Sequence, residues 1–400
     1  MSPRNKSSGH SPPDLKVVFA TVTWPPCHPG RLVKKNNVKL TLTVGLIALL
    51  LFCLPLMGVW LSGEEILPYL TLPPGKEHVP VAPFSWAVFA FLATTIALCL
   101  APFLLHLFRS QKNIERYKAP SPGGLPWWGR VGLVVFLFSW LLAWTRFPWF
   151  ERFQACTFEP LWLSYILVVN ALTHKRTGGC MLTKAPVTLL SLFVMSAVFW
   201  WFFEYLNRFV GNWSYHNGPG VLSTLNVHAS ISFSTVLPGV TSTCDLIGTF
   251  PRIRAGMDRF VKVDASSQPL APWLVLLFSC TVLAGIGVWP DLLFPALWVA
   301  PLLLILSVQA IAGYPTILSP LKTGDWSRMW LMVVSALVCG FFWEMWNFFS
   351  LAHWEYAIPY VGRFHIFEMP LLGYAGYFPF GLECAVIADC VRRVLPPAAR

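Results

Sequence analysis

Charged residues are scarce in this chain. Asp, Glu, Lys and Arg make up 12% of its 400 residues, whereas 56% of the residues are hydrophobic. A soluble domain carries roughly twice that share of charge. This deficit and a mean hydropathy of +0.59 exclude an ordinary soluble globule. They predict an all-α, polytopic membrane protein.

Several motifs that carry chemistry are also missing. The ten cysteines include no Cys-x-x-Cys pair, and most lie in apolar runs, where cysteine acts as a small hydrophobe. No two histidines have the His-x-x-x-His spacing of a helical metal site. We therefore predict no disulfide framework, no metal site and no cofactor. No basic stretch interleaved with aromatic residues stands outside the apolar runs, so nucleic acid is not an expected partner.

Long apolar runs are abundant. A run of about 20 residues crosses the bilayer as a helix. Ten runs are candidates for spans, near residues 39–61, 84–108, 131–147, 158–173, 185–206, 229–250, 271–289, 292–312, 328–348 and 367–391. The first of them follows 38 polar, basic residues, which do not resemble a cleavable signal.

Lysine and arginine are distributed unevenly among the connections between these runs. With the N-terminus in the cytoplasm, 24 of the 29 lie on that side. The other side holds Lys76, Arg146, Arg152, Arg208 and Arg363. Because loops rich in Lys and Arg stay inside, the bias predicts a multi-pass protein of the inner membrane with both termini cytoplasmic. It also predicts contact with membrane lipids.

One pattern occurs twice. Two aromatic residues, Glu-x-x-Asn and then Trp-x-Tyr follow each other near residues 202–215 and again near 342–356. The corresponding pairs are Glu204 with Glu344, Asn207 with Asn347, Trp213 with Trp354 and Tyr215 with Tyr356. Carboxylic acids inside or at the edge of the bilayer are costly and usually have a function.

The duplication extends over two halves of four predicted spans each. Pro238 corresponds to Pro379 in the last span of each half, and Trp162 to Trp298 in an earlier one. Four spans are an even number, so the halves insert in the same orientation, as a parallel repeat. The predicted organisation is a tail over 1–38, a two-span hairpin and linker over 39–124, a first repeat over 125–250, a cytoplasmic linker over 251–270, and a second repeat and tail over 271–400.

The second half carries more polar chemistry than the first. Glu368 follows the second Trp-x-Tyr, and Glu383 lies in the last span, whereas the first half has no acid at the place of Glu368. We therefore place the predicted centre at Glu344, Glu368 and Glu383. Asp389 precedes Arg392 and Arg393 and is expected to form an ion pair at the inner face.

Two interpretations of the repeated acids stay open. In the first, a protonated Glu344 or Glu368 acts as a general acid and Asn347 orients it. In the second, the pairs Glu204–Asn207 and Glu344–Asn347 are hydrogen-bonding contacts that join helices. Trp343, Trp346, Trp354 and Tyr356 surround the second acid, and such rings either form a membrane-interface belt or line a pocket that stabilises a cation.

The segment containing Glu344, Trp354-Glu355-Tyr356 and Glu368-Met369-Pro370 resembles the membrane-integral carotenoid enzymes, namely the lycopene cyclase domain and the related carotenoid hydratases. The likeness covers roughly residues 200–240 and 340–385. That family shows paired acids after a proline, whereas here a single Glu368 precedes Pro370. The resemblance implies a multi-span unit, often duplicated, that protonates a double bond of a long polyene.

The sequence thus predicts an intramembrane pocket, acidic and aromatic, for a hydrophobic small molecule such as an isoprenoid or carotenoid. The expected chemistry is acid-catalysed cyclisation, isomerisation or hydration of a double bond. A proton-coupled transporter or channel, and a structural membrane protein, are the alternatives. The ligand and the oligomeric state are left open.

Overall fold

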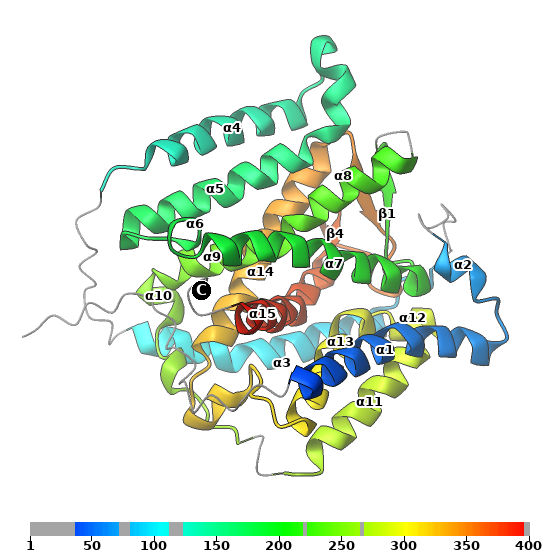
Figure 1. Cartoon of the computed structure of the whole chain (residues 1–400). Coiled ribbons are helices and arrows are strands. Elements are labelled where there is room, and N and C mark those ends of the chain that lie inside the picture. The colour runs from blue at the N-terminus through cyan, green and yellow to red at the C-terminus, as the bar shows by residue number, and fades with distance from the viewer. Residues whose placement is uncertain (1–36, 72–80, 112–122, 219–221, 265–267, 396–400) are drawn as a thin grey trace, which may run out of the picture.

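The computed structural model describes residues 37–71, 81–111, 123–218, 222–264 and 268–395. Most of the predicted tail over 1–38 lies outside these ranges. About 75% of the described residues are helical and 4% are in strands, which confirms the all-α prediction. Figure 1 shows the long helices running side by side as one bundle.

The N-terminal hairpin and the first half contain the following elements. They are α1 (Asn37–Ser62), α2 (Leu67–Leu70), α3 (Trp86–Ser110), α4 (Trp127–Trp144), η2 (Pro148–Cys156), α5 (Phe158–Thr177), α6 (Met181–Lys184), α7 (Pro186–Val210), β1 (Trp213–His216), α8 (Leu222–Ser234) and α9 (Val236–Gly248).

The linker and the second half follow. They contain α10 (Pro251–Arg254), η3 (Met257–Arg259), α11 (Ala271–Gly285), α12 (Pro290–Leu293), α13 (Ala296–Ile311), η5 (Ser319–Thr323), α14 (Ser327–Phe349), β2 (His353–Tyr356), β3 (His365–Ile366), β4 (Met369–Pro370), η6 (Leu371–Gly376) and α15 (Tyr377–Val394).

Helix length limits which of the predicted spans cross a bilayer as single helices. Within the described ranges, six helices are long and apolar enough to do so: α1, α3, α4, α7, α14, and η6 with α15. A seventh is η2 with α5, which are bent by 71° relative to each other. The predicted spans at 229–250, 271–289 and 292–312 contain helices of 13, 15 and 16 residues. These are shorter than the roughly 20 residues that a spanning helix needs.

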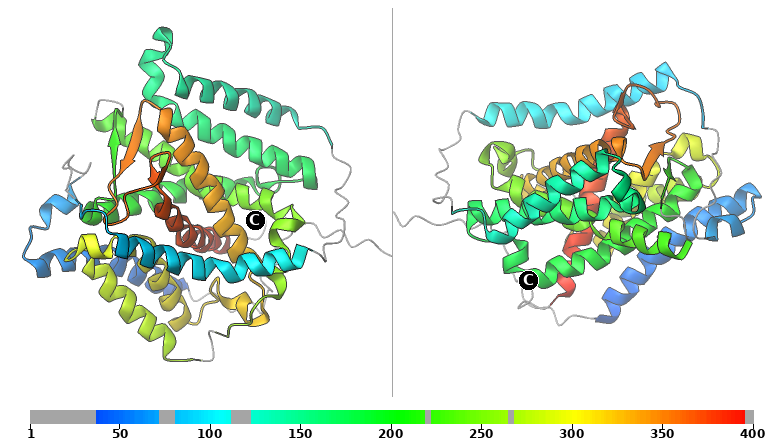
Figure 2. Two further views of the ribbon diagram at one scale, coloured as in Figure 1. Left: turned by 180° about the vertical axis from the view of Figure 1, so that it is seen from behind. Right: turned by 90° about the horizontal axis from the view of Figure 1, so that it is seen from above.

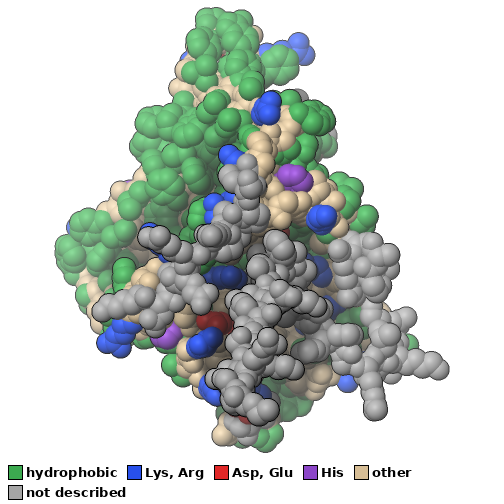
Figure 3. Space-filling model, turned by 90° about the vertical axis from the view of Figure 1, so that its left-hand side faces the viewer, with side chains coloured by type: hydrophobic (Ala, Val, Ile, Leu, Met, Phe, Trp, Pro, Cys, Tyr) green, Lys and Arg blue, Asp and Glu red, His purple; other side chains and the backbone are tan. Residues whose placement is uncertain are grey.

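The two ends of the bundle differ in charge and in structure. One, here called the basic end, carries α6, α10 and the end of α15, and Figure 3 shows Lys and Arg side chains gathered on it. Described residues there include Lys175, Arg176, Lys184, Arg252, Arg254, Arg392 and Arg393. The opposite strand end carries α2, α12 and the strands (Figure 1).

Helices of the two halves pack against each other through aromatic rings in the core. Trp162 of α5 lies 4.8 Å from Trp343 of α14, ring centre to ring centre. In the other half, Trp298 of α13 lies 5.1 Å from Phe203 of α7. Each of these tryptophans therefore contacts the helix that carries the opposite copy of the repeated motif.

The N-terminal hairpin joins the second half through a close contact between the backbones of two helices. Gly58 of α1 lies so close to α11 that a Cβ atom on it would stand 1.9 Å from the carbonyl oxygen of Ala284. A Cβ on Gly287 would in turn stand 2.5 Å from the carbonyl oxygen of Pro55. Small residues at such crossings allow backbones to approach closely in membranes.

Replacing Gly58 by valine should therefore separate α1 from α11. The expected cost is about 1–3 kcal/mol of unfolding free energy, as for other overpacked contacts. Thermal unfolding of the solubilised protein, followed by tryptophan fluorescence, measures it. Gly45→Val is the matched control, because a Cβ on Gly45 meets nothing within 4 Å. Equal unfolding temperatures for the two variants would contradict the prediction.

Candidate functional site

The two copies of Trp-x-Tyr form one antiparallel pair of strands at the strand end. Gly211, with φ of +61°, ends α7 and turns the chain into β1, as glycine does at many helix ends. Trp213 pairs with Tyr356 and Tyr215 with Trp354, around the central pair Ser214–Glu355. The tryptophan of each copy is thus opposite the tyrosine of the other. The sequence predicted an all-α protein, whereas the structure has strands here.

Glu204 is the hydrogen-bond acceptor at the centre of the first copy. It is 3% exposed. Its Oε1 accepts from the indole N–H of Trp200 at 2.9 Å and of Trp213 at 3.1 Å, and from the hydroxyl of Tyr215 at 2.7 Å. Three donors on one buried oxygen join α7 firmly to β1.

Glu344 occupies the same place in the second copy, with a different set of partners. It is fully buried. Its Oε1 accepts from the hydroxyls of Tyr356 at 2.8 Å and Tyr377 at 2.7 Å. Its Oε2 is buried without a hydrogen-bond partner among the described residues. One oxygen of this carboxyl is therefore held by two donors, and the other is buried without a partner.

Tyr356 is fixed as a donor to Glu344. The indole N–H of Trp354 donates to its hydroxyl at 2.9 Å. Burial, and then the neighbouring Glu344, raise the pKa of the Tyr356 phenol well above its ordinary value. The phenol therefore keeps its proton at neutral pH and donates a hydrogen bond to the Glu344 carboxyl.

At two matching positions, one half has a large side chain where the other has a small one. This difference explains why the two acids have different partners. Trp200 stands at the position of Gly340, and Val236 at that of Tyr377. The ring of Tyr377 fills the space over Gly340, where a Cβ atom would stand 2.4 Å from it. Glu204 thus receives an indole from its own helix, whereas Glu344 receives a phenol from α15. Sequence reasoning did not single out Tyr377, although the Trp200–Gly340 difference was a usable signal.

The two asparagines hold the strands rather than the acids. Asn207 donates to the carbonyl oxygen of Trp213 at 2.8 Å and accepts from its N–H at 3.3 Å. Asn347 makes the same two bonds to Trp354, both at 2.7 Å. Because both described bonds of Asn347 go to the Trp354 backbone, this amide positions the strand and orients Glu344 only indirectly.

Of the three tryptophans that the sequence predicted around the second acid, Trp354 and Trp343 contact its hydrogen-bond partners Tyr356 and Tyr377, whereas Trp346 packs in the aromatic core with Trp162 and Tyr165. Trp343 stacks on Tyr377 at 6.1 Å, and Trp346 packs against Trp162 at 5.2 Å. Trp343 and Trp346 are 5% and 1% exposed. Glu344 is therefore buried next to aromatic side chains, two of which donate to it through their hydroxyls.

Glu368 lies beside this cluster in a strained turn. It forms, with Phe367, the two-residue connection between β3 and β4. Phe367 has φ of +56°, and Tyr360 and Phe364 in the same loop also have positive φ. Such conformations are unfavourable for residues other than glycine and often mark functional sites. Glu368 is half-buried. Among the described residues, the hydrogen bonds of Glu344 go to Tyr356 and Tyr377 and not to Glu368, so the structure places the two predicted acids in the same region without joining them.

Glu383 lies apart from them. It is 1% exposed, and neither carboxyl oxygen has a hydrogen-bond partner among the described residues, apart from a weak interaction with the backbone of Leu302. At the matching place in the first half, Ser242 accepts from Asn170 at 2.9 Å. Leu306 stands where Asn170 would be, so the acid has no counterpart to its partner.

Replacing Glu383 by leucine should stabilise the protein. A buried polar group without a partner costs about 1–3 kcal/mol, which the substitution recovers. Ser242→Ala, at the matching position, should lower the stability instead, because Asn170 loses its acceptor. Unfolding temperatures of the two solubilised variants measure both effects. A loss of stability in Glu383→Leu would show that the acid has a partner that holds it.

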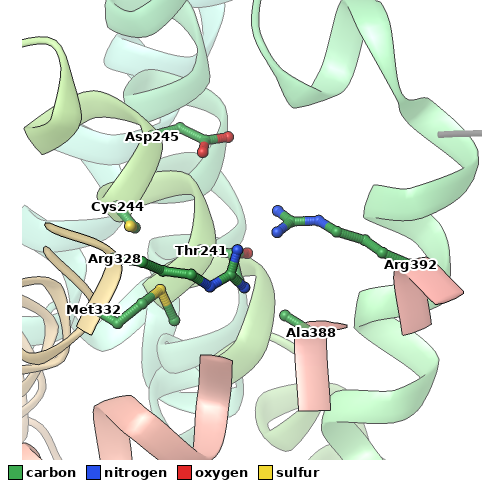
Figure 4. A pocket seen from close by; sticks show the side chains of 7 residues that line it. All are labelled: Thr241, Cys244, Asp245, Arg328, Met332, Ala388 and Arg392. Atoms are coloured by element: carbon green, nitrogen blue, oxygen red, sulfur yellow. The ribbon is translucent and has the colours of Figure 1, made fainter. Parts of the chain in front are cut away.

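A separate cluster of charges lies at the basic end. Figure 4 shows Arg328 of α14 and Arg392 of α15 pointing toward each other, next to a cavity of about 10 Å³. Arg328 forms an ion pair with Asp389, and Arg392 lies 3.9 Å from the same carboxylate. The ion pair predicted for Asp389 is therefore present. Cys244 and Asp245 of α9 also line the cavity, so the cluster joins the first half to the second.

Comparisons of this chain with protein-family models, with curated proteins and with solved structures find no match.

Proposed function

We propose that this protein is an integral membrane protein whose second half holds a buried Brønsted acid, Glu344, acting on a hydrophobic ligand of the bilayer. The expected reaction is protonation of a carbon–carbon double bond, followed by cyclisation, isomerisation or hydration. An isoprenoid or carotenoid is the expected class of ligand. Glu368 passes protons between Glu344 and the strand end of the bundle. Trp343, Trp346 and Trp354 stabilise the cation that protonation of the double bond forms.

The observation that carries this proposal is that the two oxygens of the Glu344 carboxyl differ in their hydrogen bonds. Two tyrosine hydroxyls donate to Oε1 of Glu344, while Oε2 is buried without a partner. Donors on one oxygen stabilise the carboxylate that remains after proton transfer. A proton on the other oxygen is then free to move to a ligand.

The contrast with Glu204 supports the assignment to one half. Both acids are buried, but Glu204 accepts three donors on one oxygen, as a structural contact would. The strained turn with Glu368 also occurs only beside the second acid within the described residues; the first half has helix α8 in its place. We therefore assign the contact between helices to Glu204 and the chemistry to Glu344.

The proposed topology has ten spans and a parallel repeat of four spans in each half. The crossed pairing of Trp213 with Tyr356 and Tyr215 with Trp354 supports a pseudo-two-fold axis along the membrane normal. The gathered Lys and Arg side chains favour a cytoplasmic basic end, with both termini inside, in the inner membrane. In this topology, the spans at 229–250, 271–289 and 292–312 cross the bilayer as short helices extended by α8, α12 and the connecting segments.

Lipid analysis tests the proposed activity. Extracts from cells that express the wild type, Glu344→Gln or Glu204→Gln are compared by mass spectrometry. We expect a product of changed double-bond number or added water in the wild type and in Glu204→Gln, and its absence in Glu344→Gln. Identical profiles in all three would refute the proposal.

One observation favours a second candidate, a proton-coupled transporter. The predicted span at 229–250 is broken between α8 and α9, and Glu383 is an intramembrane acid without a strong partner. Transporters of parallel or inverted repeats bind ions near such breaks. Proton-dependent uptake into vesicles, lost in Glu383→Gln but kept in Glu344→Gln, would select this candidate.

A further inference from the structure

Three side chains of the first half form a line of contacts at the strand end. Sγ of Cys156, the last residue of η2, lies 3.9 Å from Nε2 of His228 in α8. Nδ1 of the same imidazole lies 3.1 Å from Oε1 of Glu159, in the first turn of α5. A thiol, an imidazole and a carboxyl group thus stand in the order of a nucleophile, its general base and the acid that orients the base.

Glu159 determines which nitrogen of His228 faces the thiol. A carboxylate only accepts hydrogen bonds, so Nδ1 carries the imidazole proton and Nε2 presents its lone pair to Cys156. Both side chains are partly withdrawn from water, since that of Glu159 is 13% exposed and that of His228 is 30% exposed. The arrangement therefore allows His228 to take the thiol proton when Cys156 attacks.

The fold holds Cys156 at a sharp corner of the chain. The helices η2 and α5 are bent by 71° relative to each other, with Thr157 between them. Gln154 is buried and donates to the carbonyl oxygen of Leu142 at 2.7 Å, which fixes η2 to α4. Cys156 also directly precedes the 20-residue helix α5. The positive end of that helix favours the negative charge that attack on a carbonyl group produces.

The surface beside Cys156 is apolar. Phe150, Phe153 and Cys156 recur every three residues in η2 and so share one face of this 3₁₀ helix. The rings of Phe150 and Phe153 lie 6.0 Å apart, and Phe153 is 56% exposed. Trp149 of the same helix is 66% exposed, as tryptophans are at a membrane–water boundary. Figure 2 shows η2 as the teal segment that projects beyond the ends of α4 and α5.

We propose that Cys156, His228 and Glu159 are a hydrolytic triad that removes an acyl chain from a glycerophospholipid. The ester bonds of such a lipid lie in the interfacial layer between the hydrocarbon core and water. Its acyl chain is apolar, as is the face of η2 that carries Cys156. This activity goes beyond the function proposed for Glu344 and uses none of its residues.

The reaction has two steps. The sulfur of Cys156 attacks the ester carbonyl carbon while Nε2 of His228 takes the thiol proton; the bond from that carbon to the glycerol oxygen breaks, and the imidazolium protonates the leaving alcohol. The acyl chain is then a thioester on Cys156. Water, giving a proton to His228, attacks this thioester; the carbon–sulfur bond breaks, the sulfur recovers the proton, and a fatty acid leaves. Glu159 stabilises the imidazolium in both steps.

Release of fatty acid by the full-length protein in vesicles tests the triad. The probe is phosphatidylglycerol with a radiolabelled acyl chain. Cys156→Ala and His228→Asn should each slow release about a hundredfold or more. Cys280→Ser is the matched control, because Cys280 is also a partly buried free thiol and makes no hydrogen bond with a histidine among the described residues. It should keep the wild-type rate.

Glu159 is a positioning residue, and its variant separates this role from a structural one. Glu159→Gln keeps the size of the side chain but no longer stabilises the imidazolium. It should lower kcat about tenfold or more and leave KM unchanged, because only the transition state is affected. A rise in KM with kcat unchanged would contradict the proposed role.

A second measurement needs no variant that folds well. After incubation with the labelled lipid, wild-type protein should carry an acyl group on Cys156 that hydroxylamine releases. Iodoacetamide should modify Cys156 about tenfold faster than Cys280, since the adjacent base activates the thiol. The proposal is overturned if no fatty acid is released, if Cys156→Ala still releases it, if only an added acyl thioester and not the lipid is cleaved, or if the two thiols react equally fast.

Discussion

Replacing Glu344 by glutamine should slow formation of the product at least a hundredfold while leaving the protein folded. The glutamine oxygen still accepts from Tyr356 and Tyr377, which donate to Glu344 at 2.8 and 2.7 Å. Its NH₂ group, however, does not transfer a proton to carbon. Loss of a positioned general acid typically costs 10²–10⁴ in rate. Product formation per mole of folded protein, measured in membranes, gives this ratio.

The repeat itself supplies the control for this experiment. Glu204→Gln changes an acid of the same type, depth and helix position, and we expect product formation within about twofold of the wild type. Glu344→Asp should be intermediate, because it keeps the acid but withdraws it from both tyrosines. If Glu344→Gln and Glu204→Gln were equally active and equally destabilised, both acids would be contacts between helices, as the second interpretation of the sequence holds.

Replacing Glu204 by alanine should produce the largest loss of stability. The substitution removes the single acceptor of Trp200, Trp213 and Tyr215. A buried donor left without a partner costs about 1–3 kcal/mol. Three donors lose their acceptor together and the structure around them can relax in part, so we expect about 3–5 kcal/mol in total. Denaturant or thermal unfolding of the solubilised protein measures the change.

Ser214→Ala separates this effect from damage to the strand. Ser214 lies between Trp213 and Tyr215 and is exposed, so its replacement should change the unfolding free energy by less than about 0.5 kcal/mol. Glu204→Gln keeps the acceptor oxygen and should fall between the two variants. A change below about 1 kcal/mol in Glu204→Ala would mean that the three donors find other partners.

Local sequence patterns predicted the helices well, because apolar runs of spanning length have few alternatives in a membrane. The predicted runs at 39–61, 84–108 and 328–348 correspond closely to α1, α3 and α14. Proline limited the rest: Pro295 stands between α12 and α13 in the run at 292–312, and Pro301 lies inside α13. Composition alone does not show where such a run stops being one helix.

The site was predictable in its residues but not in its contacts. Repetition singled out Glu344 and Asn347, yet the partner of Asn347 is the backbone of Trp354, which no side-chain pattern reveals. Tyr377 comes from α15, 33 positions after Glu344, and reaches it only because Gly340 leaves room. The pairing of β1 with β2 joins residues about 140 positions apart. Such contacts depend on how helices assemble, and periodicity within one segment does not encode them.

The crossed register of β1 and β2 has a consequence for the origin of the chain. In an isologous interface, the same surface of both subunits is used, so that if residue i of one contacts residue j of the other, j also contacts i. Two identical subunits form such an interface around a two-fold axis. A single half would expose its Trp-x-Tyr strand and could cover it only with another copy. Under the parallel repeat that we propose, the present protein corresponds to two such subunits in one chain. Gly340 and Tyr377 then differ from Trp200 and Val236, a difference that a symmetric dimer of one gene product does not permit.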